Sequence, residues 1–210
     1  MKAVVVDYHM GNLFSVRQAC EQVGFESVIS SKKEDVDHAD AIILPGVGAF
    51  GVAMEHLKKN DLVDVLKRNI EQKKPFLGVC LGFQLLMDRS TEFGEYEGLG
   101  VFRGSVKKFP ARVRKIPHVG WNTLRVNEGN ASCSRVFKDI GYDEYYYFVH
   151  SYYVDTREDV LTTTDYEGFS FCSAIAKDHI WGLQFHPEKS ARQGLKLYEN
   201  FFQYVKGINR

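Results

Sequence analysis

The segment Gly78-Val79-Cys80-Leu81-Gly82 constrains the fold of this chain more than any other. It follows the short apolar run 75–77 and leads into the largely apolar stretch 83–87. A Gly-x-nucleophile-x-Gly pattern at a strand-to-helix junction predicts a sharp turn, because small flanking residues leave room for a strained backbone. The turn lifts Cys80 out of the sheet and places it at a helix N-terminus, where the positive end of the dipole favours a thiolate. The chain is therefore expected to carry a reactive cysteine at one strand end.

A partner for this nucleophile occurs far downstream, in the segment Gln-Phe-His-Pro-Glu-Lys-Ser at 184–190. The segment closes another apolar strand, 180–183. His186 would take the thiol proton and later protonate a leaving amine, while Glu188 would orient the imidazole. Two residues apart on an extended segment, these side chains can point the same way. Cys80, His186 and Glu188 are thus predicted to form the triad of a nucleophilic acyl transfer.

The rest of the chain predicts an α/β fold. Apolar strands at 3–6, 27–29, 41–44 and 76–79 alternate with helical patterns at 13–23, 50–57 and 62–72. Such an alternation implies a mostly parallel central sheet with helices on both faces, a three-layer sandwich. Further strands are expected within 101–126 and 145–154, as antiparallel additions, and at 171–176 and 180–184, before a last helix at 191–205. We expect a single domain over residues 1–210.

Composition excludes several classes of protein. The 27 basic and 27 acidic side chains cancel, which argues against a general nucleic-acid binder. No apolar stretch approaches the roughly 20 residues of a membrane span, and the first strand is too short for a signal peptide. Cysteines at 20, 80, 133 and 172 form no CxxC pair, so no disulfide framework, zinc site or other metal centre is expected. These features predict a cytoplasmic enzyme without a cofactor.

A tetrahedral intermediate also needs donors for its oxyanion. The N–H of Leu81, directly after the nucleophile, is one natural donor. The loop 45–50, Pro-Gly-Val-Gly-Ala-Phe, is a candidate for the second, although a plain strand-to-helix turn is equally compatible with its spacing.

Other polar residues are candidates for substrate contacts. Gln84 lies one helical turn after Cys80 and on the same face, although an exposed or satisfied glutamine is the simpler interpretation. Ser151 and Tyr152 follow the aromatic run 145–148 and could donate to a substrate carboxylate, with hairpin packing as the default.

Several separated motifs agree with one family. The chain resembles the class I (triad) glutamine amidotransferases over essentially its whole length, and more narrowly the glutaminase subunits of imidazole glycerol phosphate synthase. The motifs that carry this resemblance are Asp7-Tyr8 with Gly11-Asn12-Leu13, the loop 44–50, the elbow 78–84, Pro-His-Val-Gly-Trp-Asn at 117–122, Tyr-Phe-Val-His-Ser-Tyr at 147–152, and 184–190.

The resemblance implies roles for individual residues and a single type-1 glutamine amidotransferase domain. Cys80, His186 and Glu188 match the catalytic triad that converts L-glutamine to glutamate and ammonia. Gly48 and Leu81 match the two donors of the oxyanion hole, and Val47 lies at a peptide that is expected to flip on activation. The remaining matches are Gln84, Ser151 and Tyr152 for glutamine binding, and Asn12, Trp121, Asn122 and Tyr147 for the face toward a partner subunit.

The implied partner is a (β/α)8-barrel cyclase, which uses the ammonia to make imidazole glycerol phosphate and a purine precursor, AICAR, in histidine biosynthesis. One departure from the family occurs at His9, where glycine is common in a loop toward the expected partner face. Histidine tolerates unusual backbone angles less well than glycine does.

Four other interpretations remain. A paralogous amidotransferase could serve nucleotide-sugar modification instead, and the glutaminase of pyridoxal phosphate synthesis also meets a barrel, although its oxyanion loop differs. A non-catalytic scaffold subunit would not need the intact triad. A stand-alone cysteine hydrolase would be fully active without a partner.

Overall fold

A parallel sheet forms the centre of the computed structural model, which describes residues 1–141 and 143–208. Its strands lie in the order β2-β1-β3-β4-β14 and all run parallel to their neighbours. Their bounds are β1 (Lys2–Val6), β2 (Glu26–Ser30), β3 (Ala41–Leu44), β4 (Phe76–Val79) and β14 (Ile180–Leu183). Their apolar runs are continuous because both faces of the sheet are covered.

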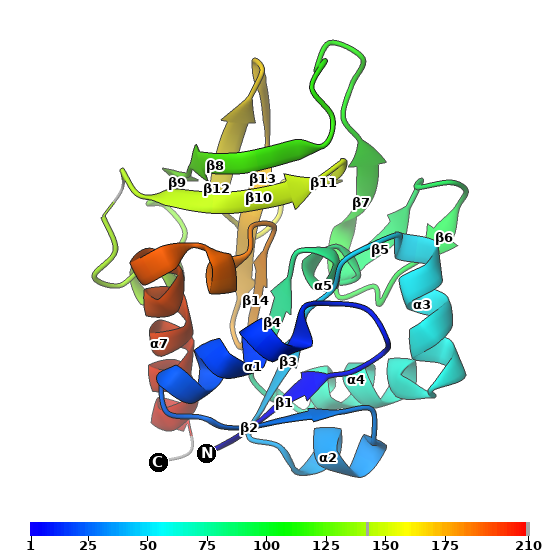
Figure 1. Ribbon diagram of the computed structural model, residues 1–210, viewed down its shortest axis with the longest axis vertical. Helices are drawn as coiled ribbons and strands as arrows, with labels where there is room; N and C mark the ends of the chain where they lie inside the picture. The colour runs from blue at the N-terminus through cyan, green and yellow to red at the C-terminus, as the bar shows by residue number, and fades with distance from the viewer. Residues whose placement is uncertain (142, 209–210) are drawn as a thin grey trace.

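Helices pack on both faces of this sheet (Figure 1). On one face lie α1 (Leu13–Gln22) and α7 (Ala191–Ile208), and on the other α2 (Lys33–His38), α3 (Phe50–Lys59) and α4 (Leu62–Glu71). The predicted α/β sandwich is therefore confirmed. Helix α2 was not predicted, because its sequence is polar and it buries only Val36.

The second half of the chain extends the sheet with mostly antiparallel strands, as predicted. They are β5 (Met87–Ser90), β6 (Tyr96–Glu97), β7 (Phe102–Lys108), β9 (Arg125–Val126), β11 (Tyr152–Asp155), β12 (Val160–Tyr166) and β13 (Phe169–Lys177). The threonine-rich β12 was not predicted, because buried Thr162 and Thr164 interrupt the apolar pattern of a strand. The Thr162 hydroxyl bonds to the Ser173 hydroxyl, and the Thr164 hydroxyl donates to the Thr123 carbonyl.

A separate two-stranded ribbon lies across the carboxyl ends of β4 and β14 (Figure 1). It pairs β8 (His118–Thr123) with β10 (Tyr145–His150) in antiparallel register. The remaining short elements are α5 (Leu81–Gln84), α6 (Cys133–Val136) and the 3-10 turn η1 (Pro187–Lys189). Because the N–H of His186 bonds to the Tyr147 carbonyl, η1 is joined to this ribbon.

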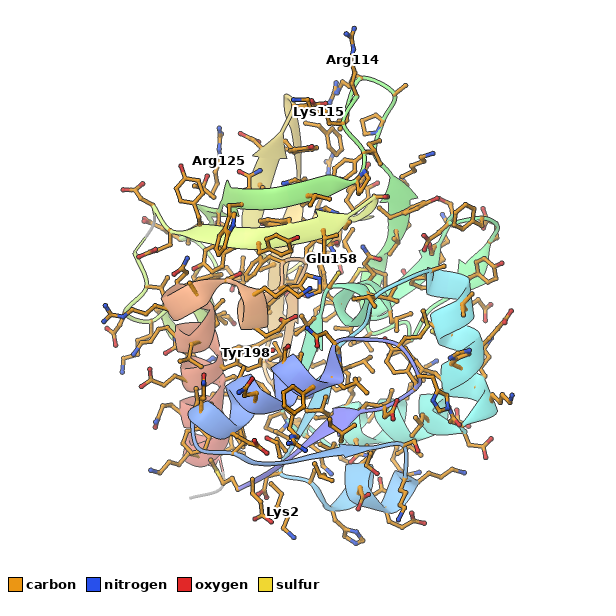
Figure 2. The ribbon with its side chains drawn as sticks, viewed as in Figure 1. Lys2, Arg114, Lys115, Arg125, Glu158 and Tyr198 are labelled. Carbon is orange, nitrogen blue, oxygen red and sulfur yellow. The ribbon has the colours of Figure 1, made fainter. Side chains whose placement is uncertain are left out.

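Side chains fill the spaces between these layers (Figure 2). Tyr198 of α7 is fully buried, whereas Arg114 and Lys115 lie at the far tip of the loop between β7 and β8. None of the described helices is long and apolar enough to cross a membrane.

Candidate active site

The predicted triad is assembled by the register of two neighbouring parallel strands. In the β4–β14 pair, Val79 lies opposite Leu183, and the N–H of Cys80 donates to the Leu183 carbonyl at 2.7 Å. Because the carboxyl ends of parallel strands meet at one edge of a sheet, Cys80 and His186 leave that edge together although they are far apart in the sequence.

Cys80 occupies the strained turn that the sequence predicts. Its backbone angles are φ 55° and ψ −109°, a conformation that costs free energy and persists only where the surroundings enforce it. The flanking glycines are needed: a Cβ on Gly82 would lie 1.8 Å from the Leu44 carbonyl oxygen, and one on Gly78 2.9 Å from the Gly82 oxygen. The helix that follows is only the single turn of α5, so its dipole contributes less than the sequence suggests.

His186 and Glu188 meet by a different backbone route from the one predicted. Residues 187–189 form the turn η1 rather than an extended strand, yet Nδ1 of His186 lies 2.7 Å from Oε1 of Glu188. Ser190 holds this turn, since its hydroxyl donates to the His186 carbonyl at 2.6 Å and accepts the Tyr147 N–H at 3.0 Å. Sequence reasoning missed this role of Ser190, although the residue lies within the motif.

The electrostatics of the site favour a charged imidazole. Burial opposes the charge on His186, but the Cys80 sulfur and the Glu188 carboxylate outweigh it and raise the pKa of His186. Nε2 of His186 is buried and finds no hydrogen-bond partner within the described ranges 1–141 and 143–208, so it is available to a reacting group. A histidine that holds its proton beside a cysteine suits the imidazolium–thiolate state of a thiol nucleophile.

Burial disfavours the thiolate form of the other three cysteines. Burial raises the pKa of Cys20 and Cys133, and it raises the pKa of Cys172 to about 12. All four cysteines of the chain are free thiols, so Cys80 alone combines a strained turn with an adjacent base.

The predicted oxyanion loop lies beside Cys80 in a closed arrangement. The N–H of Leu81 donates to the Gly46 carbonyl at 3.3 Å, so this donor already has a partner. Tyr8 anchors the loop, because its hydroxyl donates to the Pro45 carbonyl at 2.6 Å. Only glycine fits at 46, where a Cβ would lie 2.1 Å from the Tyr8 hydroxyl oxygen.

His9, next to that anchor, has a φ of 68°. It thus adopts the left-handed conformation for which glycine is the usual residue, as the family pattern implies for this position.

A cavity of about 440 Å³ opens at Cys80. The residues predicted to bind the substrate and the oxyanion all line it: Val47, Gly48, Leu81, Gln84, Ser151 and Tyr152. Gln84 is buried rather than exposed, and its amide nitrogen donates to the Tyr152 carbonyl and to Oε1 of Gln184, each at 3.0 Å. The amide nitrogen of Gln184 in turn lies 3.9 Å from the Cys80 sulfur.

Glu92 also lines this cavity and was not identified from the sequence. Its carboxylate accepts the N–H of Phe50 at 2.7 Å, at the start of α3. Burial raises the pKa of Glu92, although the Phe50 N–H opposes this shift. No motif signal marks an acid within the polar stretch 88–97, and only the tertiary structure brings it to the cavity.

Two of the residues predicted to face a partner lie on the outer side of the β8–β10 ribbon. Trp121 is 51 % exposed and pairs with Tyr147, with ring centroids 6.0 Å apart. Asn122 is instead tied into the subunit, because its side chain bonds to the Asp165 carbonyl and to the Thr123 N–H. Asn12 occupies the N-cap position of α1, but its side chain makes no capping bond.

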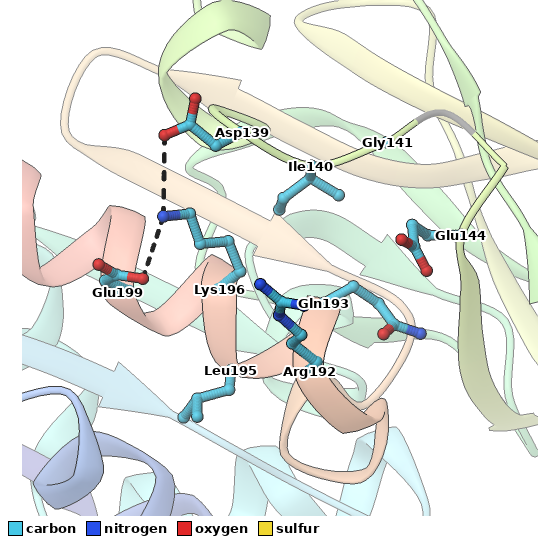
Figure 3. Close-up of a pocket in the computed structure, with 9 residues that line it drawn as sticks. All are labelled: Asp139, Ile140, Gly141, Glu144, Arg192, Gln193, Leu195, Lys196 and Glu199. Atoms are coloured by element: carbon cyan, nitrogen blue, oxygen red, sulfur yellow. Dashed lines mark hydrogen bonds and ion pairs between the residues drawn. The ribbon is translucent and has the colours of Figure 1, made fainter.

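A larger cavity, of about 620 Å³, lies away from the triad, between α7 and the segment before β10. There the ammonium of Lys196 is held between the carboxylates of Asp139 and Glu199 at 3.8 and 3.1 Å (Figure 3). It carries no nucleophile or base of the triad. In the part of the chain that the structure describes, no group of three His, Cys, Asp or Glu side chains could hold a metal ion.

Two buried histidines beside the active-site cavity predict acid sensitivity. Burial lowers the pKa of His118 to about 4 and that of His150 to about 3, against 6.5 for a free imidazole. Below about pH 6.5 the unfolded chain binds protons that the folded chain does not, so the free energy of unfolding falls by up to roughly 1.4 kcal/mol per pH unit for each imidazole. Above about pH 6.5 both imidazoles are neutral in the folded and in the unfolded chain, so the free energy of unfolding no longer depends on their titration.

We therefore expect urea unfolding to show a loss of stability from about pH 6.5 down to pH 4. The His118→Phe variant should show a shallower slope over the same interval, because one titrating group is gone. Equal slopes would mean that the pair does not stay neutral in the folded chain.

The fold and the comparisons with known proteins define a class-I glutamine amidotransferase. The family model of class-I glutamine amidotransferases matches residues 4–205. Solved structures show the same fold: a glutamine amidotransferase at TM-score 0.73 and 19 % identity, over 97 % of this chain and 98 % of that one, and PurLQS from Thermotoga maritima at 0.73 and 20 %, over 100 % and 99 %.

Closer relatives narrow the class. Imidazole glycerol phosphate synthase subunit HisH of Aquifex aeolicus is 50 % identical over 204 residues, which are 96 % of each chain. The HisH subunit of Sulfurimonas denitrificans is 44 % identical over 206 residues, or 95 % of this chain and 97 % of that one. The chain belongs to the class-I glutamine amidotransferase family and, within it, to the HisH subunits of imidazole glycerol phosphate synthase.

Proposed function

We propose that this chain is the glutaminase subunit of an imidazole glycerol phosphate synthase in histidine biosynthesis. Residues 1–210 act as one amidotransferase domain that hydrolyses L-glutamine to glutamate and ammonia. The observation that carries this proposal is the position of Cys80, at a strained strand end beside His186, whose Nδ1 lies 2.7 Å from Glu188. The HisH relatives are named as subunits, so the chain works with a partner subunit.

The proposed reaction has two halves. The Cys80 thiolate attacks the carboxamide carbon of glutamine, and the carbonyl electrons move to oxygen. When the tetrahedral intermediate collapses, the C–N bond breaks and His186 gives its proton to the departing nitrogen. Ammonia is released, and the glutamyl group remains on Cys80 as a thioester. A water molecule, deprotonated by His186, then attacks the thioester, and glutamate and the thiol are released. Glu188 keeps the imidazole oriented and stabilises its charge in both halves.

The closed oxyanion loop represents a resting arrangement in this proposal. The Gly46 carbonyl that occupies the Leu81 N–H belongs to the same peptide unit as the Val47 N–H. A flip of this peptide would release Leu81 and turn the Val47 N–H toward the site, beside Gly48. A missing oxyanion donor costs roughly 10²–10³ in rate, so this flip could switch the enzyme on.

The cavity offers complementary groups to glutamine. Both N–H bonds of the Gln84 amide are used within the protein, which leaves Oε1 of Gln84 as an acceptor. The carboxylate of Glu92 suits the α-ammonium of the substrate. The turn at Ser151 and Tyr152 offers donors for its carboxylate.

The partner in this proposal is a (β/α)8-barrel cyclase in the cytoplasm. Its docking face includes the aromatic pair of Trp121, which is 51 % exposed, and half-buried Tyr147, because exposed apolar side chains mark interaction sites. Free ammonia is mostly protonated in water at neutral pH and loses its nucleophilicity. A dry passage between the subunits would keep it reactive until the cyclase uses it to form imidazole glycerol phosphate and AICAR.

Glutamine hydrolysis by the chain alone and with its cognate cyclase tests this proposal. With the cyclase and its acceptor nucleotide bound, we expect turnover to rise roughly 10²–10³-fold, as the second oxyanion donor is restored. Fast hydrolysis without any partner would instead identify a stand-alone hydrolase. Failure to complement a histidine auxotroph, with stimulation intact, would point to a different acceptor such as a nucleotide sugar.

A further inference from the structure

A pair of buried histidines lies next to the glutamine cavity but outside the triad. His118 of β8 and His150 of β10 are directly opposite in the ribbon and are 2 % and 6 % exposed. Nδ1 of His118 lies 3.1 Å from Nε2 of His150. His150 lines the cavity itself, whereas His118 stacks on Tyr166 with ring centroids 3.9 Å apart.

The proton positions on both rings follow from the groups at the two ends of the pair. Nδ1 of His150 lies 2.8 Å from the Tyr152 carbonyl, which can only accept a hydrogen bond, so this nitrogen carries the proton. Burial lowers the pKa of both imidazoles far below neutrality, so each ring has one proton. Nε2 of His150 is therefore an acceptor, and Nδ1 of His118 must donate to it.

The contact between His118 and Asn122, at the other end of the pair, requires the same proton position on His118. Nε2 of His118 must accept, and the amide nitrogen of Asn122 lies 3.4 Å from it. The orientation of that amide is known, because its oxygen accepts the Thr123 N–H at 2.8 Å and its nitrogen donates to the Asp165 carbonyl at 3.0 Å. The hydrogen bonds thus run in one direction, from Asn122 through His118 and His150 to the Tyr152 carbonyl.

That carbonyl is also a contact of the predicted substrate-binding glutamine. The Gln84 amide nitrogen donates to the Tyr152 oxygen and to Oε1 of Gln184, each at 3.0 Å. If Nδ1 of His150 lost its proton, its lone pair would face the lone pairs of the Tyr152 oxygen. The carbonyl would then move, and Gln84 would lose one of the two acceptors that set its orientation.

We propose that His118 and His150 are positioning residues of the glutamine site, which hold the Tyr152 carbonyl so that Gln84 presents Oε1 to an N–H group of the substrate. The inference rests on the proposed function and adds a specificity element to the same cavity. The hydrogen bonds of the pair lead to the Tyr152 carbonyl and not to the proposed triad, so the pair acts on substrate affinity rather than on the chemical step.

Two substitutions at one position separate hydrogen bonding from packing. His118→Phe keeps an aromatic ring for the stack on Tyr166 but removes the donor to His150. His118→Asn shortens the side chain but can place an amide N–H where Nδ1 of His118 lies. Each variant is assembled with the cyclase, and KM and kcat for glutamine are measured beside ammonium-dependent synthesis and the alkylation rate of Cys80 by iodoacetamide.

We expect His118→Phe to raise KM for glutamine roughly 5- to 20-fold with kcat within about twofold, since one positioning hydrogen bond is lost. His118→Asn should stay within about threefold of the wild-type KM. Ammonium-dependent synthesis and Cys80 alkylation should be unchanged in both, which shows that the complex and the elbow are intact.

An unchanged KM in His118→Phe would overturn the inference, and so would an equal rise in both variants, which would assign the effect to packing. A loss of ammonium-dependent synthesis or of Cys80 alkylation would also overturn the inference, because it would show that His118 has a purely structural role. If the wild-type complex itself hydrolysed no glutamine, the proposed function would fail instead, and its alkylation rate would show whether Cys80 is reactive.

Discussion

The Cys80→Ala variant is expected to lose glutamine-dependent synthesis while the complex still uses ammonium. Removal of the nucleophile eliminates the thioester route, and comparable losses in other triad enzymes suggest a fall of roughly 10⁴-fold or more. The cyclase reaction itself needs only ammonia, so a high ammonium concentration at alkaline pH should support the wild-type rate. Synthesis of the product from each nitrogen source, by the reconstituted complex, is the measurement.

Cys133→Ala is the matched control for this experiment. It removes another buried thiol, at the start of α6 and outside the lining of the cavity at Cys80, and should leave both activities close to wild type. Loss of the ammonium-dependent reaction in Cys80→Ala would show that Cys80 is needed for assembly rather than for chemistry. Retention of glutamine-dependent synthesis would remove Cys80 from the mechanism altogether.

The Gly82→Ala variant is expected to lose much of its stability and the reactivity of Cys80. A Cβ at this position would lie 1.8 Å from the Leu44 oxygen, and neither atom can rotate away, because one is backbone and the backbone fixes the position of the other. Strand β3 or the elbow must shift, which should lower the free energy of unfolding by roughly 3 kcal/mol or more. Urea unfolding and the rate of Cys80 alkylation report the two effects.

Gly207→Ala is the control for a glycine-to-alanine change as such. Gly207 lies in α7, and outside its own helix backbone no atom of the described residues lies within 4 Å of an added Cβ, so alanine should raise stability by up to about 1 kcal/mol. An unfolding midpoint of Gly82→Ala equal to that of the wild type would mean that the close approach of β3 and the elbow is not required.

Apart from α2, the order of strands and helices up to β4 was predictable because local patterns are strong there. Apolar runs such as 41–44 are buried on both sides, and their composition alone marks them. The second half was predicted only in outline. In β12 two of the three buried positions are threonines, whose hydroxyls bond to partners on other strands, which a local pattern cannot reveal.

Adjacent residues alone predicted the strained turn at the elbow, because glycines at 78 and 82 leave the room that such a turn needs. The surroundings of Cys80 depend instead on contacts between distant parts of the chain. Strand register brings His186 to Cys80, the turn η1 orients Glu188, and Glu92 and His150 reach the cavity from elsewhere in the chain. The two kinds of feature differ in sequence separation. Backbone strain at a turn is encoded by adjacent residues, whereas hydrogen-bond partners across a sheet exist only once distant strands have paired.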